Sequence, residues 1–321
     1  MMAEDSRKNV VVVLNGISLH KKIFYHKFFS RLRNQCNLEI FETLSRNDAI
    51  TIASRAAEKY VDIVIAAGGD GTLNQVVNGI LRGREKETKL PAIGLIPIGT
   101  GNDFARTAGI QCDANQLMDL IKEFAPRKID VGSIRYTPFR DKVKKTGDDQ
   151  RYFVNVADIG MGPMVVDKVL KSGRAWGHAA AYYKSIISTF FSYKPMVVNV
   201  SSPGWNWKGK LRSLAVANGR FYGHGLTIAP DAELDDRMFS IFICGNVSVL
   251  DFIWQTPTLR KGKFIALKDV HYKKAVSVNF TADAPCMIEG DGEILGVLPA
   301  KISIVERQLD FLIPKTRRGQ D

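Results

Sequence analysis

The sequence contains few cysteines, and those it has lie far apart. They are Cys36, Cys112, Cys244 and Cys286, with no CxxC pair and no histidine placed to pair with them. Zinc sites and disulfide frameworks both need closely or regularly spaced cysteines. We therefore expect reduced thiols, with neither a zinc site nor a disulfide scaffold.

Long hydrophobic runs are also missing. The early apolar run at residues 10–14 is far too short for the core of a signal peptide or for a membrane span. There is no internal repeat and no low-complexity tract. We expect a soluble, cytoplasmic protein that touches membranes at most from their surface.

Length and charge narrow the class of protein further. The 321 residues are long for one compact domain and comfortable for two. The 45 Lys and Arg residues against 33 Asp and Glu residues give a formal net charge of +12. This excess suits anionic partners such as nucleotides, nucleic acid or anionic lipid headgroups, and charge alone does not choose among them.

The first part of the chain alternates between strand and helix patterns. This rhythm predicts a parallel sheet with helices on both faces, whose ligands lie beyond the carboxyl ends of the strands. The predicted strands are residues 10–14, 38–42, 61–67 and 92–96, and the predicted helices are residues 23–32, 48–60, the stretch after Thr72, and 115–124.

After Pro126 the pattern changes to short β-rich pieces separated by Gly, Pro and Asn. Such pieces predict an all-β sandwich or barrel-like second domain, interrupted by a helical segment at residues 176–191. The predicted strands are residues 151–156, 196–200, 211–217, 238–244, 275–280 and 300–305. We place the α/β domain at residues 1–127, joined by residues 306–321, and the β domain at residues 128–305.

A glycine-rich turn, Gly68–Thr72, joins an apolar strand to a helical pattern. Its glycines permit positive φ and close approach of a ligand, and the N–H groups that open the next helix can bind phosphate. Asp70 is unexpected there, because a carboxylate repels phosphate unless a cation bridges them or it accepts from another donor. Its presence suggests Mg²⁺. A glycine turn without a ligand is the alternative.

A second strand-to-helix turn follows the next predicted strand, at Gly99–Gly101. Thr100 and the adjoining N–H groups are candidates for nucleotide contact, and an ordinary helix cap at Asn102 and Asp103 is the alternative. A third strand end carries Asn15, which is weak evidence alone.

Two further motifs each have a simpler explanation. Gly204–Lys210 matches G-x-x-x-x-G-K, but Leu211 stands where Ser or Thr should be and no strand–helix context surrounds it, so a hairpin loop is the better interpretation. The segment Glu289–Glu293 crowds three carboxylates around two glycines. The pattern favours a plain Asp-Gly hairpin, whereas the clustering of like charges favours a general base or a metal site.

Three motifs in order carry a family resemblance: Gly68–Asn74, Gly99–Arg106 and Asp291–Glu293. Together they resemble the diacylglycerol kinase catalytic-domain family, and most of all its bacterial soluble lipid kinases, which are related to sphingosine kinases. The segments 153–160 and 217–232 support the likeness, which spans nearly the whole chain.

The resemblance implies an N-terminal α/β nucleotide domain, a C-terminal β-sandwich domain and an active site in the cleft between them. The residues implied to bind ATP are Asn15, Thr43, Gly68, Gly69, Asp70, Gly71, Thr72, Asn74 and Thr100. Catalysis is implied for Glu293 as the base, with Asp291 beside it and Asp70 on the nucleotide side.

Metal binding is implied at three positions. Asp70 and Asp130 would organise Mg²⁺ through water, and Asp236, aided by nearby carbonyls, would hold a structural metal in the second domain. The chain departs from the family pattern at Arg237 and His224, where the family usually has glycine, and the first departure puts the structural metal in doubt.

These residues imply an ATP-dependent and Mg²⁺-dependent kinase that phosphorylates the hydroxyl of diacylglycerol or a related lipid alcohol. The expected partner is that lipid at a membrane surface, reached by transient peripheral contact, with no nucleic acid; a homodimer is one open assembly state. A soluble-substrate kinase of the NAD kinase type and a non-catalytic nucleotide-binding regulator are the alternatives.

Overall fold

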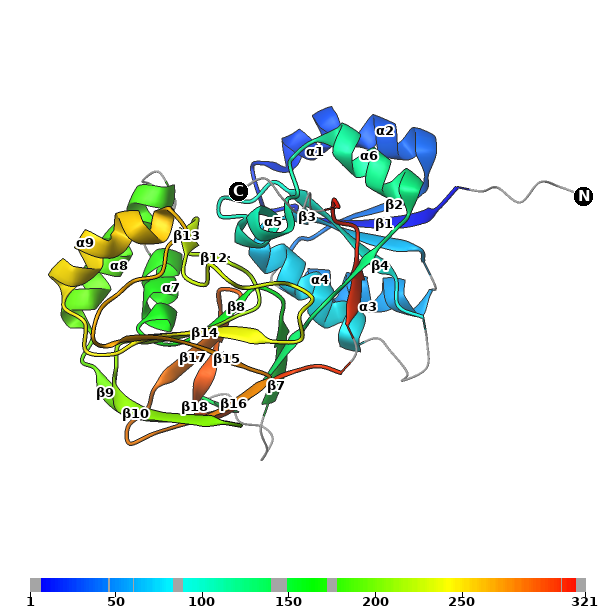
Figure 1. Ribbon diagram of the computed structural model, residues 1–321. Helices are drawn as coiled ribbons and strands as arrows, with labels where there is room; N and C mark the ends of the chain where they lie inside the picture. The colour runs from blue at the N-terminus through cyan, green and yellow to red at the C-terminus, as the bar shows by residue number, and fades with distance from the viewer. Residues whose placement is uncertain are drawn as a thin grey trace, which may run out of the picture. The chain divides into compact units, whose positions relative to one another are not determined.

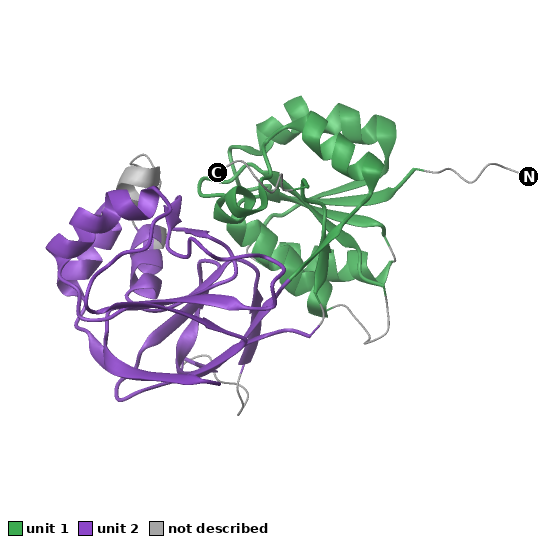
Figure 2. Ribbon diagram, in the orientation of Figure 1, with its two compact units in different colours: residues 1–129, 308–321 green, residues 130–307 purple. Residues whose placement is uncertain are grey.

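The computed structural model describes residues 7–45, 47–59, 61–82, 89–139, 149–171, 178–306 and 308–315, without the side chains of residues 170 and 178–183. The chain divides into two compact units, drawn in separate colours in Figure 2. Unit 1 contains residues 1–129 and 308–321, and unit 2 contains residues 130–307. These limits lie within two residues of the boundaries that the sequence suggests.

Unit 1 is an α/β domain built on one six-stranded sheet of order β2-β1-β3-β4-β19-β5. Neighbours run parallel from β2 to β19, and β5 is antiparallel to β19. The strands are β1 (Asn9–Leu14), β2 (Asn37–Glu42), β3 (Ile63–Gly68), β4 (Ala92–Pro97), β5 (Arg127–Ile129) and β19 (Leu309–Phe311). The C-terminal segment thus adds a strand to the N-terminal domain.

Helices cover both faces of this sheet (Figure 1). They are α1 (Lys21–Lys27), α2 (Phe29–Gln35), α3 (Asp48–Glu58), α4 (Asp70–Arg82), α5 (Asp103–Ala108) and α6 (Ala114–Glu123). Val10, Val12 and Leu14 of β1 point to α1, α2 and α6, because alternate residues of a strand face the same side. The single helix expected at residues 23–32 is wrong, since the chain divides at Phe28 into α1 and α2.

Unit 2 is an antiparallel β sandwich. Its main sheet has the order β10-β9-β16-β18-β17-β8-β11-β14-β15, with β6 paired to β18 and β7. The strands are β6 (Gly132–Pro138), β7 (Asp149–Phe153), β8 (Val156–Gly160), β9 (Met196–Ser202), β10 (Trp205–Leu211), β11 (Ser213–Ala217), β14 (Phe239–Cys244), β15 (Val270–Ala275), β16 (Ser277–Ala282), β17 (Met287–Gly290) and β18 (Glu293–Ile304), with β12 (Phe221–Tyr222) and β13 (Leu226–Thr227) as a separate pair.

The central strands of unit 2 are buried on both faces. In β11, Leu214 and Val216 face the sandwich core, whereas Ala215 and Ala217 face a second apolar cluster. Helices α7 (Gly162–Lys171), α8 (His178–Ser192) and α9 (Val249–Arg260) cover that second cluster (Figure 1). The predicted fold class, an α/β domain with a parallel sheet followed by a β sandwich, is confirmed.

Two local predictions in unit 2 are settled by the strands and helices observed. Trp205 and Trp207 lie half-buried in β10 and pack against the sandwich core, so Gly204–Lys210 belongs to the β9–β10 hairpin mainly as its second strand, and the loop expected there is limited to the turn. The helical segment expected at residues 176–191 is found as α8, with residues 172–177 outside the described part. Helices α7 and α9 are additions; Pro257 lies inside α9 and hides its pattern in the sequence.

Candidate functional site

The two glycine turns of unit 1 lie directly against each other. β3 and β4 are adjacent parallel strands that end together at Gly68 and Pro97. A Cβ added to Gly99 would lie 2.3 Å from the Cα of Gly69, so only glycine allows the two backbones to approach this closely. The turns therefore form one continuous main-chain surface beyond the carboxyl ends of the strands.

Asp70 joins these two turns through its carboxylate. Its Oδ2 accepts from the N–H of Asp103 at 3.1 Å, and its Oδ1 accepts from the N–H of Phe104 at 3.1 Å. Asp70 therefore caps α5 from the first turn of α4, which explains a carboxylate in a turn that otherwise suits phosphate.

Three strand ends contribute linked polar side chains to the same edge of unit 1. Asn15 Nδ2 donates to Thr72 Oγ1 at 3.5 Å, and the N–H of Gly16 donates to Thr43 Oγ1 at 3.3 Å. Thr43 and Thr72 are buried and Asn15 is half-buried. The structure thus brings these three predicted ATP-binding residues together in a single network.

The other predicted ATP-binding residues differ in their exposure to solvent. Thr100 is exposed, and a Cβ built on the half-buried Gly71 would meet nothing within 4 Å, so the backbone there is open. Asn74 is fully buried, and its Oδ1 accepts from Asn78 Nδ2 at 3.2 Å. Its burial favours an indirect role in ATP binding, which stays a prediction.

A magnesium ion at Asp70 stays a prediction, because both oxygens of this carboxylate already accept main-chain N–H groups of α5. A Cβ built on Gly101 would lie 3.1 Å from Asp70 Oδ2 and 3.8 Å from Asp103 Oδ2, so the two carboxylates face one small region, and Arg106 Nε lies 3.8 Å from Asp103 Oδ1. Mg²⁺ takes oxygen ligands and is held in nucleotide sites by one or two carboxylates together with phosphate oxygens. Asp103, which the sequence suggested only as a helix cap, is thus an additional candidate ligand for the magnesium ion.

In unit 2 the predicted Asp-Gly hairpin connects β17 to β18. Asp291 and Gly292 have φ of 49° and 81°, as a two-residue hairpin turn requires. The Asp291 carboxylate accepts from the N–H groups of Val154, Asn155 and Val156 at 2.9–3.0 Å. This arrangement makes Asp291 an anchor of the hairpin tip, while its catalytic role stays a prediction.

Glu293 opens β18 directly after this anchored turn, and it is half-buried. Asn155 and Asn218 lie close to this turn, and they come from the two segments, 153–160 and 217–232, that support the family resemblance. Asn218 Nδ2 donates to the carbonyls of Asp130 and Val154 at 3.0 and 2.9 Å. Asp130, Asp291 and the start of β18 therefore belong to one hydrogen-bonded region of unit 2.

Two buried carboxyl groups lie outside the implied site residues: Asp158, which sequence reasoning missed, and Glu289, which it named only within the carboxylate cluster Glu289–Glu293. Glu289 and Asp158 stand opposite each other on β17 and β8 and are almost fully buried. Burial raises the pKa of Asp158 to about 8, although Ser213 Oγ donates to it at 2.9 Å. Burial, and then the neighbouring Asp158, raise the pKa of Glu289 well above its usual range. In the sequence, the signal for both residues is a carboxylate placed within an apolar strand.

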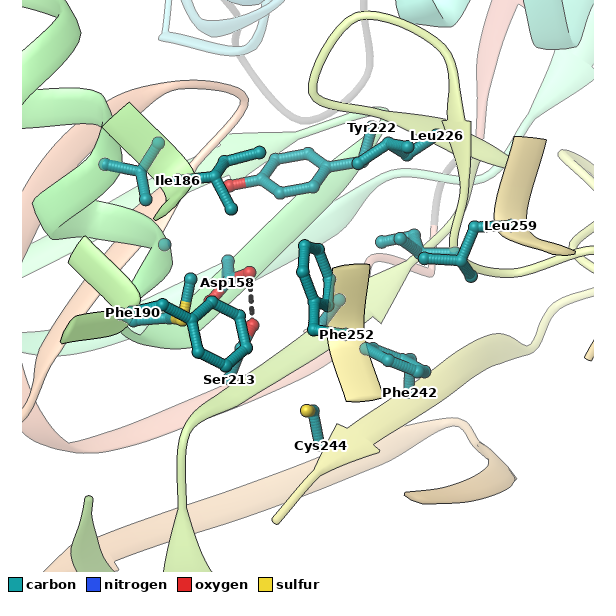
Figure 3. A pocket seen from close by; sticks show the side chains of 15 residues that line it. Asp158, Ile186, Phe190, Ser213, Tyr222, Leu226, Phe242, Cys244, Phe252 and Leu259 are labelled. Atoms are coloured by element: carbon teal, nitrogen blue, oxygen red, sulfur yellow. Dashed lines mark hydrogen bonds between the residues drawn. The ribbon is translucent and has the colours of Figure 1, made fainter. Parts of the chain in front are cut away.

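Asp158 and Ser213 lie at the wall of an apolar cavity, which Figure 3 shows from close by. Ile186 and Phe190 of α8, Phe252 of α9 and Phe242 of β14 line it. Tyr222 also lines the cavity, and its hydroxyl donates to Glu289 Oε1 at 2.9 Å. Glu289 Oε2 in turn accepts from the N–H of Gly292 at 2.7 Å, one residue before Glu293. The polar part of the cavity is thus linked to the hairpin turn.

The surroundings of the Asp236 carboxylate do not fit a bound divalent cation. Its Oδ1 accepts from the N–H of Met238 at 3.0 Å and its Oδ2 from Lys274 Nζ at 3.2 Å. Asp130 is fully buried, and its Oδ2 accepts from the N–H of Arg237 at 2.6 Å. Within the described residues, no three His, Cys, Asp or Glu side chains gather closely enough to hold a metal ion.

The two departures from the family pattern both occupy the left-handed region. Arg237 has a φ of 62°, and His224, between Gly223 and Gly225, has a φ of 67°. Glycine adopts this conformation without the penalty of a side chain, so glycine at these positions elsewhere in the family has a backbone reason.

Together, the parallel α/β domain, the abutting glycine turns and the β sandwich define a two-domain protein of the NAD kinase and diacylglycerol kinase type. A family model described as the diacylglycerol kinase catalytic domain matches residues 9–134, and one described as the YegS C-terminal NAD kinase beta sandwich-like domain matches residues 156–313. The chain belongs to the diacylglycerol kinase catalytic-domain family, and it is a kinase at that level of description, for which an ATP-type phosphoryl donor is implied.

Relatives and solved structures agree with this assignment. The chain is 30% identical over 280 residues to the diacylglycerol kinase of Bacillus subtilis, covering 87% of this chain and 86% of that protein. It is 27% identical to the diacylglycerol kinase of Staphylococcus carnosus, covering 96% of each.

Among solved structures, a putative diacylglycerol kinase from Bacillus anthracis has a TM-score of 0.75 at 21% identity, covering 96% of this chain and 98% of that one. A yeast NADH kinase complexed with NADH has a TM-score of 0.54 at 8% identity, covering 98% and 85%. At these identities the likeness shows the fold.

Proposed function

We propose that the protein transfers the γ-phosphoryl group of ATP to the hydroxyl of diacylglycerol or a related lipid alcohol, giving a phospholipid such as phosphatidate. The observation offered for the acceptor class is the apolar cavity of unit 2, whose lining suits the hydrocarbon chains of a lipid. The relatives named diacylglycerol kinase support the same choice.

The nucleotide side of the proposal rests on unit 1. The main-chain N–H groups beginning α4 and the open backbone at Gly71 would contact phosphate, with Asn15, Thr43, Thr72 and Thr100 around them. Asp70 and Asp103 would hold Mg²⁺, which neutralises phosphate charge when bound. Asp70 also keeps the two turns in place through its contacts to α5.

The catalytic base of the proposal is Glu293. A bond forms between the acceptor oxygen and the γ-phosphorus while the bond from that phosphorus to the β,γ-bridging oxygen breaks. The hydroxyl proton passes to the Glu293 carboxylate, and ADP carries away the electron pair of the broken bond. Asp291 positions Glu293 by fixing the turn before it.

The acceptor side of the proposal lies in unit 2. The apolar cavity beneath α8 and α9 (Figure 3) has a volume of ≈ 60 Å³, so acyl chains would enter it only as these two helices move apart. Burial raises the pKa of Asp158 to about 8 and that of Glu289 well above its usual range, which favours the uncharged forms in this lining. Hydrogen bonds from Tyr222 through Glu289 to Gly292 connect the cavity wall to the turn that carries Glu293.

The outer surfaces of the same two helices fit a membrane. Phe191, Leu250 and Trp254 are 75%, 79% and 82% exposed, and a shallow groove lined by α8 and α9 residues joins the two helices. Exposed Lys184, and Arg260, Lys261 and Lys263 at the end of α9, suit anionic headgroups. We name Phe191, Ile187, Leu250, Ile253 and Trp254 the apolar helix face and propose that it contacts the lipid surface transiently.

No helix in the part of the chain that the structure covers is long and apolar enough to cross a membrane. A homodimer, and the absence of nucleic-acid partners, stay predictions.

The test is ATP consumption by the full chain with Mg²⁺, measured with lipid-alcohol vesicles, with vesicles lacking the alcohol, and with soluble acceptors such as NAD. The proposal predicts ATP consumption that requires the lipid alcohol. Consumption with NAD and no vesicles would instead indicate a soluble-substrate kinase, and ATP binding without consumption under any condition would indicate a regulator.

A further inference from the structure

The loop at residues 230–238 in unit 2 is rich in acids, and cationic side chains of the same unit hold it. It contains Asp231, Glu233, Asp235 and Asp236, close to the buried Asp130 at the start of the unit. Acidic loops of this kind need counter-charges, which a bound metal or basic side chains can supply. The contacts show which of these this chain uses.

Lys274 of β15 occupies the centre of one group of oxygens. Its Nζ lies 3.2 Å from the carbonyl oxygen of Asp231, 3.7 Å from Asp231 Oδ2 and 3.2 Å from Asp236 Oδ2. An ammonium group has three donors and no acceptor, so it can hold three oxygens in the way a cation does. Asp236 has no carboxylate oxygen without a partner, because Oδ1 accepts from Met238.

Arg237 performs the corresponding task for Asp130. Its N–H donates to Asp130 Oδ2, its Nε lies 3.6 Å from Asp130 Oδ1, and its Nη1 donates to the carbonyl of Glu306 at 3.0 Å. Asp130 and Glu306 lie near the two ends of unit 2, so one side chain binds both. This contact accounts for a residue other than glycine at a φ of 62°.

A third basic side chain also holds this loop, because Arg220 Nε donates to the carbonyl of Ala232 at 3.0 Å. We propose that Lys274 and Arg237 replace the structural divalent cation that the family pattern places at Asp236, so that residues 230–238 are held without a bound metal. The metal requirement of this chain is then confined to the nucleotide side, at Asp70 and Asp103.

The test measures unfolding and metal binding of the full chain without nucleotide. All four tryptophans, at positions 176, 205, 207 and 254, belong to unit 2, so their fluorescence reports its unfolding. We expect the same unfolding temperature in EDTA and in Mg²⁺. Arg237→Met and Lys274→Met should each lower it by at least about 3 °C, whereas Lys273→Met, an exposed neighbour on the opposite side of β15, should not.

A second variant separates pairing from general damage. Asp130→Asn in the Arg237→Met chain removes a buried charge that has lost its guanidinium neighbour, so it should recover part of the lost stability or of the folded yield; an equal loss in the double variant contradicts the pairing. Mn²⁺ binding is followed by electron paramagnetic resonance. Binding that Asp236→Asn abolishes, together with a lower unfolding temperature in EDTA, would overturn the proposal.

Discussion

At the scale of single residues, the carboxylates of this protein are distinguished by the groups they accept from. Asp70 and Asp291 each accept main-chain N–H groups from a segment far away in the sequence, and so they hold turns in place. Asp158 and Glu289 are buried with raised pKa values. The same residue types therefore anchor turns in one setting and lie buried with a raised pKa in another, according to their surroundings.

Asp70→Asn tests the magnesium role of Asp70. The amide keeps one acceptor oxygen for α5 and loses the charge, so we expect the affinity for Mg²⁺ with ATP to fall by about tenfold or more. The measurement is the Mg²⁺ concentration for half-maximal ATP consumption, with the exposed Asp119→Asn on α6 as the control. An unchanged Mg²⁺ dependence would argue against this role.

Asp158 should make the stability of unit 2 depend on pH. Its pKa in the folded protein, about 8, lies above the ordinary value of 3.8, so the folded state binds more protons between these values. The contribution of Asp158 to the free energy of unfolding is therefore highest below about pH 4 and falls as pH rises toward 8, at most by about 1.4 kcal/mol per pH unit.

Asp158→Asn removes this titration and leaves that of Glu289. Urea unfolding between pH 6 and 8, followed by tryptophan fluorescence, should show a smaller loss of stability in this variant than in the wild type. Asp283→Asn, at an exposed position, should behave as the wild type does. Equal slopes for Asp158→Asn and the wild type would contradict the raised pKa.

At the scale of elements, the sequence predicted what periodicity and glycine turns encode. The strands before Gly68 and Gly99, the parallel sheet and the Asp-Gly hairpin were all predictable, because their residues act locally. The break at Phe28 and helix α9 were not, because tertiary packing decides them. The contact of Asp70 with α5 and the pairing of Asp130 with Arg237 join positions more than thirty residues apart, and no local pattern records such contacts.

The apolar helix face of α8 and α9 provides a prediction at this scale. Leu250→Glu combined with Trp254→Glu should weaken binding to phosphatidylcholine–phosphatidylglycerol vesicles by at least about tenfold, since burial of each side chain contributes on the order of 2 kcal/mol. Both side chains are mostly exposed, so the fold and ATP binding should persist.

Vesicle sedimentation measures this binding, and Leu44→Glu is the matched control because Leu44 is 85% exposed in unit 1. Equal vesicle binding by the double variant and the wild type would remove the apolar helix face from the membrane contact.

At the scale of the whole molecule, the two units divide the proposed chemistry. In the proposal, unit 1 would bind phosphate through its glycine turns and Mg²⁺ through its carboxylates, and unit 2 contains the apolar cavity and Glu293. Family membership establishes a kinase of the diacylglycerol kinase catalytic-domain family. The lipid acceptor is the proposal that depends on the cavity.

The central claim is tested most directly by following label from the γ-phosphate of ATP into lipid, with Mg²⁺ and vesicles containing diacylglycerol or other lipid alcohols. The account predicts a labelled phospholipid from the wild type. Glu293→Gln should form it about 10²–10⁴ times more slowly with ATP binding nearly intact, while the exposed Glu39→Gln should match the wild type. No labelled lipid from folded protein across the panel, or near-normal transfer by Glu293→Gln, would contradict the account.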